Sequence, residues 1–134
     1  MSPRLSPVER SALLGVARAA IRARLGLGPA PALPETGALG QPRGAFVTLR
    51  RGGELRGCIG RFEPAGSLAR TVADMAVAAA NEDPRFPPVA PEELDDLDVH
   101  VSALGPRVPL PDPAGLRVGV HGLVVRQGWH RGVL

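Results

Sequence analysis

The chain has 134 residues, 44% of them hydrophobic and 22% charged, which is enough for one domain that buries a core without disulfides. Its formal net charge at pH 7 is only +3 although every basic residue is an arginine, and aromatic residues make up 3% of the sequence. This composition excludes the aromatic stacking platform of single-strand nucleic-acid binders and argues against a nucleic-acid partner.

The cysteine content and the distribution of apolar residues predict where the protein resides. Cys58 is the only cysteine, so no intrachain disulfide can form. The sequence shows no basic and apolar leader and no apolar run of about 20 residues, and we therefore expect a cytoplasmic protein without a membrane segment. One cysteine and three widely spaced histidines lack metal-ligand spacing, so we expect neither a metal site nor another cofactor.

The first predicted element is an amphipathic helix. Ser6 and Glu9 have the spacing of a capping box, with a proline at the first helical position, and the helix should end at Gly26. One helical face should pack against a core. The apolar residues of this face are Leu13, Leu14, Ala17, Ala20, Ile21 and Leu25.

A long connection and a hairpin follow the helix. Residues 26–44 are rich in proline and glycine and predict a surface connection with at most a short helical turn, placed where it could border a cleft. Gly52 and Gly53 satisfy the positive φ angles of a tight turn. They should join two strands, at residues 45–50 and 55–60.

The next predicted elements are a second helix and a charged loop. Ser67 should cap a helix that ends near Asn81 and buries an apolar stripe in the core. Residues 83–88 are too rich in proline for a helix or a central strand and predict a rigid loop. Residues 91–94 should form a single helical turn.

Three further strands are predicted toward the C terminus. Residues 97–103 alternate between apolar and polar side chains, with His100 on the polar side. Residues 122–126 and 131–134 predict a last hairpin. The residue patterns therefore yield about five short strands and two clear helices.

The strand at residues 55–60 has an unusual sequence, Leu-Arg-Gly-Cys-Ile-Gly, which places the only cysteine between two glycines. A glycine inside a strand usually marks a bulge or a close approach by another backbone or a ligand. Because side chains alternate along a strand, we expect Arg56 and Cys58 to share one face, about 7 Å apart.

This hexapeptide resembles the signature of the AMMECR domain family, whose bacterial members are the A components of the AmmeMemoRadiSam system. Further blocks in the family order lie at residues 44–49, 83–86, 99–104, 121–123 and 131–134. The resemblance covers nearly the whole chain, and the family pattern continues past its last residue. It therefore implies a single AMMECR-type domain over residues 1–134, shortened at its C terminus.

The resemblance also implies a fold and partners. The fold class would be α+β, an antiparallel sheet flanked by helices, in two lobes with a cleft at the signature strand. The implied partners are a Memo-type protein and a radical S-adenosylmethionine (SAM) enzyme. The resemblance implies no settled reaction.

Two interpretations of the signature strand remain open. In the first, the protein is a ligand- or partner-binding component whose groove holds a small molecule or a peptide segment. The residues of this groove would be Arg56, Gly57, Ile59, Gly60 and Arg85, the last binding a carboxylate or phosphate by its planar fork.

In the second interpretation, the protein is a small cysteine-dependent enzyme. Cys58 would be the nucleophile, Arg56 would favour its thiolate, and His121 would be the general base. The plain alternatives are an inert buried thiol for Cys58 and a turn residue for His121. The binding interpretation is favoured because no base or oxyanion hole is explicit around the thiol.

The block at residues 83–86 also has a plain interpretation. Asp83 would cap the turn, Arg85 would pair with it, and Phe86 would fill part of the core.

Overall fold

The computed structural model describes residues 5–64, 66–104, 124–127 and 130–133. The elements in chain order are α1 (Pro7–Arg24), η1 (Gly37–Gly40), β1 (Ala45–Arg51), β2 (Glu54–Arg61), α2 (Leu68–Asn81), η2 (Pro91–Asp96), β3 (Leu97–Ala103), β4 (Val124–Gln127) and β5 (His130–Val133). Each helix and strand predicted from the sequence is present, with its ends displaced by at most a few residues.

Among the described residues, the strands form two antiparallel sheets. The larger sheet has three strands in the order β2-β1-β3, and β4 pairs with β5 in a sheet of two. The structure therefore shows an α+β fold with a three-stranded antiparallel sheet and does not show the expected sheet of about five strands. Alternation indicates that a segment is a strand but not which strand lies beside it.

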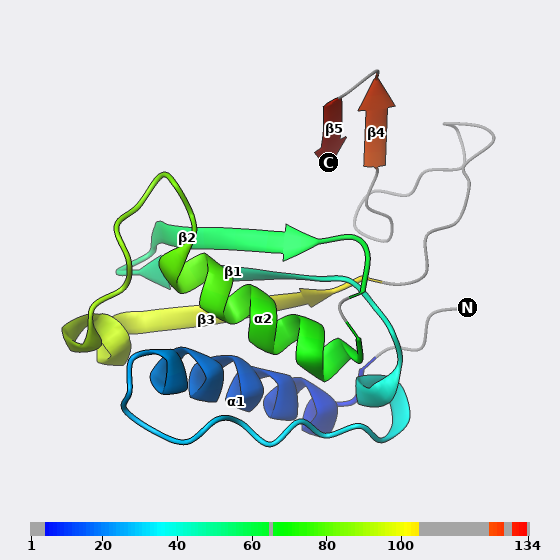
Figure 1. Ribbon diagram of the computed structural model, residues 1–134, viewed down its shortest axis with the longest axis horizontal. Coiled ribbons are helices and arrows are strands. Elements are labelled where there is room, and N and C mark those ends of the chain that lie inside the picture. The colour runs from blue at the N-terminus through cyan, green and yellow to red at the C-terminus, as the bar shows by residue number, and fades with distance from the viewer. Residues whose placement is uncertain (1–4, 65, 105–123, 128–129, 134) are drawn as a thin grey trace.

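Both main helices cover the same face of the larger sheet (Figure 1). The central strand shows why, since Ala45, Val47 and Leu49 are fully buried while Phe46 and Thr48 between them are only half-buried. The buried set faces α1 and α2, and the alternate set lies on the opposite face. This two-layer α+β arrangement gives the signature strand β2 an edge position beside α2.

Local sequence signals begin and end the elements as expected. At the start of α1, Ser6 Oγ accepts a hydrogen bond from the Glu9 amide at 3.1 Å, and Glu9 Oε1 accepts one from the Ser6 amide at 2.9 Å. Gly26, with φ of +75°, follows the end of this helix. Ser67 caps α2 by accepting from the Arg70 amide at 3.2 Å.

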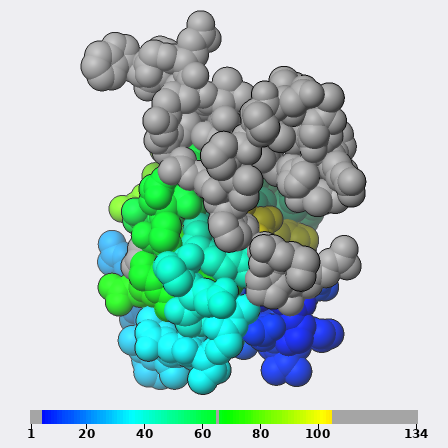
Figure 2. Space-filling view, turned by 90° about the vertical axis from the view of Figure 1, so that its right-hand side faces the viewer, coloured from blue at the N-terminus to red at the C-terminus, as the bar shows by residue number. Residues whose placement is uncertain are grey.

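The long connection and the hairpin turn also match the sequence. The connection contains the short helix η1, which packs against both main helices. In Figure 2 the cyan atoms of this region lie between the blue atoms of the N-terminal helix and the green atoms of α2. Gly52 and Gly53 have φ angles of +58° and +83°, as a tight turn between β1 and β2 requires. In the described part of the chain, no helix is long and apolar enough to cross a bilayer.

Candidate functional site

The signature strand contains a bulge. Leu49 of β1 pairs with Gly57, but the next residue, Arg50, pairs with Leu55, so Arg56 opposes no residue of β1. A bulge of this kind re-aims the side chain at that position. The simple alternation that predicts a shared face for Arg56 and Cys58 therefore does not hold through Arg56.

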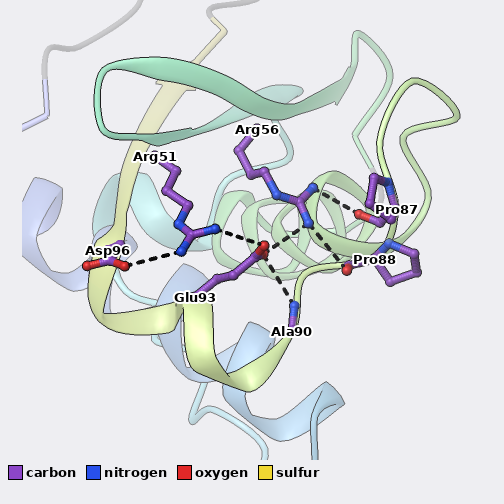
Figure 3. A network of polar contacts seen from close by, with 7 residues as sticks. All are labelled: Arg51, Arg56, Pro87, Pro88, Ala90, Glu93 and Asp96. Carbon is purple, nitrogen blue, oxygen red and sulfur yellow. Dashed lines mark hydrogen bonds and ion pairs between the residues drawn. The ribbon is translucent and has the colours of Figure 1, made fainter.

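The Arg56 guanidinium is bound at the 87–93 segment (Figure 3). It donates to the carbonyl oxygens of Pro87 at 2.9 Å and Pro88 at 3.3 Å, and to Glu93 Oε2 at 3.0 Å. The side chain is 12% exposed, whereas Arg51, which contacts Glu93 from the other side at 3.3 Å, is 46% exposed. Arg56 therefore holds this loop and η2 against the hairpin and makes no hydrogen bond to Cys58.

Cys58 is fixed by its main chain and touched by one hydroxyl. Its amide donates to Asp83 Oδ2 at 3.0 Å, and its sulfur lies 3.2 Å from Thr48 Oγ1. Thr48 pairs with Cys58 on one side and with His100 on the other, which places the three residues in one row across the face away from the helices. Within the described ranges, no acid or base side chain lies within hydrogen-bond distance of the sulfur, and His121 lies outside those ranges.

Asp83 is a buried carboxylate that joins the loop to β2. It is 4% exposed and accepts from Arg85 Nε at 3.0 Å, Arg85 Nη2 at 2.7 Å and the Arg85 amide at 3.0 Å, besides the Cys58 amide. The Arg85 guanidinium in the first place, and the Cys58 and Arg85 amides, hold the pKa of the Asp83 carboxyl far below its ordinary value, against the opposing effect of burial. The predicted Asp83 cap and its pairing with Arg85 are confirmed.

Phe86 does not fill the core as the sequence predicts. Its ring is half-buried and lies 5.4 Å from the Arg85 guanidinium carbon and 6.0 Å from that of Arg56. Val89, at 2% exposure, is the buried apolar residue of this loop. The turn that closes on Asp83 keeps Phe86 at the surface, where two cations cover its ring.

The Asp83 carboxylate makes stability depend on pH in a defined direction. Because its pKa is lower in the folded than in the unfolded chain, its contribution is fully present above about pH 4, the ordinary value, and is lost as pH falls below that. We expect Asp83→Asn to lower the urea midpoint at neutral pH, and the difference from the wild type to shrink below about pH 4. A difference that is the same at neutral and strongly acidic pH would contradict this.

The two signature glycines are packed against the protein itself. A Cβ on Gly57 would collide with the main-chain carbonyl of Ala79 in α2, and one on Gly60 would collide with the Phe46 ring. The close approach that the sequence indicates is therefore made by a helix backbone at Gly57 and by an aromatic ring at Gly60.

A surface depression lies at the carboxyl end of β2, beside α2. Its lining residues are Ile59, Gly60, Arg61, Phe62, Glu63 and Met75. The sequence-predicted binding residues thus fall in three places: Ile59 and Gly60 line the depression, Gly57 packs against Ala79 of α2, and Arg56 and Arg85 flank Phe86. Thr48 and Met75 were missed, because only the strand register and the helix position bring them to β2.

The described residues hold no group of three histidine, cysteine, aspartate or glutamate side chains that could bind a metal ion. The arrangement instead offers an edge strand, a thiol with one hydroxyl neighbour, and an arginine that is half-exposed on an aromatic ring.

These features define a small α+β domain built around a glycine-containing edge strand. The chain belongs to the AMMECR1 family, whose model matches residues 14–134. It is 47% identical to a protein of Methanothermobacter thermautotrophicus, over 97% of this chain and 72% of the relative. It is 52% identical to a protein of Thermotoga maritima, over 68% of this chain and 53% of the relative. The crystal structure of the uncharacterised protein PH0010 from Pyrococcus horikoshii is similar, with a TM-score of 0.76 and 38% identity, over 91% of this chain and 66% of that one.

Proposed function

We propose that this protein is a ligand- or partner-binding component that uses the surface around β2, in a system with a Memo-type protein and a radical SAM enzyme. The named partners follow from the family resemblance, as does a cleft between two lobes at the signature strand. The depression at Ile59 and Gly60 would be part of that cleft.

The contacts of Cys58 carry the choice of binding over catalysis. Its amide is bound by Asp83, and among the described residues the one hydrogen-bond partner of its sulfur is the hydroxyl of Thr48, which is not a general base. A thiol without a base beside it suits a binding surface better than a nucleophile.

The binding proposal predicts different effects for two substitutions in β2. Cys58→Ser should bind a purified Memo-type protein as the wild type does, whereas Arg56→Ala should weaken binding by about tenfold because it releases the loop that carries Arg85. Isothermal titration with each variant, after circular dichroism confirms that it is folded, measures this. Arg51→Ala is the matched control. Failure of the wild type to bind either proposed partner would overturn the proposal.

A cysteine-dependent enzyme is the second candidate. It is favoured by the half-buried position of Cys58 on the sheet face that the helices leave uncovered, and His121 would then be its base. Cys58 as an activated nucleophile should react with iodoacetamide well below about pH 8. A thiol in the folded protein that stays unreactive until above that pH would exclude this second candidate.

A further inference from the structure

The outer edge of β2 presents main-chain groups that the described part of the chain leaves unpaired. The Cys58 amide points away from β1 to Asp83, so in an antiparallel ladder the main-chain groups of Gly60, two residues on, point the same way. Of the groups on this edge, the Cys58 amide is satisfied by Asp83. The Cys58 carbonyl and both main-chain groups of Gly60 accept or donate no hydrogen bond within the described ranges.

The accessible part of this edge is short and clearly bounded. Toward its amino end, the buried Asp83 carboxylate occupies the Cys58 amide, which is how proteins block an edge strand against further pairing. No such block is present at Gly60 in the described part of the chain. A pairing segment is therefore confined to the stretch from Cys58 to Arg61.

The depression lies on the helix side of the same stretch. Ile59 pairs with the fully buried Val47, so its side chain projects toward the helices, and Met75 of α2 lies beside it in the depression. A residue placed opposite Ile59 on an added strand would project to the same face. Its side chain would enter the depression, which Ile59 and Met75 make apolar.

The rim of the depression carries the acidic Glu63 and the basic Arg61. Arg61 Nε donates to the Glu63 carbonyl at 2.6 Å, which fixes the arginine side chain, while its terminal nitrogens bond to no described residue. The two terminal nitrogens of the Arg61 guanidinium are therefore placed to bind a carboxylate.

We infer that the partner supplies an extended peptide segment that adds a short strand to β2 at Gly60, with an apolar side chain in the depression and an acidic residue beside Arg61. Alternating main-chain donors and acceptors along an edge fit an extended polypeptide. This inference rests on the proposed binding function and names the ligand of that surface.

A synthetic peptide tests the inference on the wild-type chain. The probe is an amidated heptapeptide of alternating threonine and valine with a central leucine and a glutamate two residues after it, titrated into the ¹⁵N-labelled protein. On a strand parallel to β2, these two side chains lie on the face of Ile59 and Arg61, and the leucine amide meets the Cys58 carbonyl. We expect amide shifts at Ile59, Gly60 and Arg61, and at least about tenfold weaker binding when the leucine amide is N-methylated. Shifts confined to other residues, or equal binding of the two peptides, would overturn strand addition.

Two substitutions at Gly60 separate the amide from the side chain. Gly60→Ala and Gly60→Pro both place a Cβ against the Phe46 ring, but only proline removes the outward amide, at an edge position where proline is tolerated. Gly60→Pro should bind the probe and the Memo-type protein at least about tenfold more weakly than Gly60→Ala.

The outcomes distinguish the two proposals. If the Memo-type protein binds both variants equally, strand addition fails while the binding function stands. If neither the probe nor either protein partner binds the wild type, both fail.

Discussion

Replacing Gly57 by alanine is expected to lower the free energy of unfolding by about 3 kcal/mol. The added methyl group would meet the carbonyl oxygen of Ala79, which belongs to the backbone of α2 and cannot rotate away as a side chain would. Relief requires α2 to move off β2, and that loosens the fully buried residues Val72 and Ala76 on the same helix. Urea unfolding followed by circular dichroism measures the change.

Gly15→Ala is the matched control for this substitution. Gly15 lies in α1, is exposed, and has no atom within 4 Å of the position that a Cβ would take. Alanine there should raise the free energy of unfolding by up to about 1 kcal/mol, because it favours the helix. If both alanines had the same small effect, close helix packing would not be the reason for a glycine at position 57.

The glycines show how far the sequence leads at the site. The glycine at position 57 correctly indicated that another group approaches the strand closely. A ligand and a helix backbone both require a glycine at such a point, so the sequence cannot distinguish them. Only the packing of α2 on β2 distinguishes them, and that packing depends on residues separated by more than a dozen positions in the chain. The expected ligand contact at Gly57 is therefore replaced by a contact within the core.

Local signals predicted the elements well because their causes are local. The capping box at Ser6 and the Gly52-Gly53 turn each depend on residues within one turn of chain, and both are present. The pairing of strands has no such local cause. Alternation could not show that β4 and β5 pair with each other and that the larger sheet has three strands.

The same limit explains the two arginines of the site. The pairing of Arg85 with Asp83 was predicted because the residues are two apart in a turn. The position of Arg56 was not, because the bulge that re-aims it arises from the register between β1 and β2. Its acceptors lie more than thirty residues away in the chain, at Pro87, Pro88 and Glu93.

Arg56→Ala should lower the free energy of unfolding by about 2 kcal/mol, because it leaves a mostly buried Glu93 carboxylate and two carbonyl groups without this charged donor. Arg51→Ala removes the other cation on Glu93, but that side chain is 46% exposed, so the loss should stay below about 1 kcal/mol. Arg56→Lys keeps the charge and loses the planar fork, so its effect should lie between the two.

Hydrogen exchange at the Cys58 amide shows whether Arg56 acts through the loop. If the Arg56 guanidinium holds residues 83–90 in place, its removal should let Asp83 leave the edge of β2, and the Cys58 amide should exchange faster in Arg56→Ala than in Arg51→Ala. Unchanged exchange at Cys58 together with a large loss of stability would mean that Arg56 stabilises η2 alone. Faster exchange would identify Arg56 as the residue that keeps Asp83 bound to the Cys58 amide, and thereby keeps this end of the β2 edge blocked. Gly60 would then be the part of the edge that is left open to pairing.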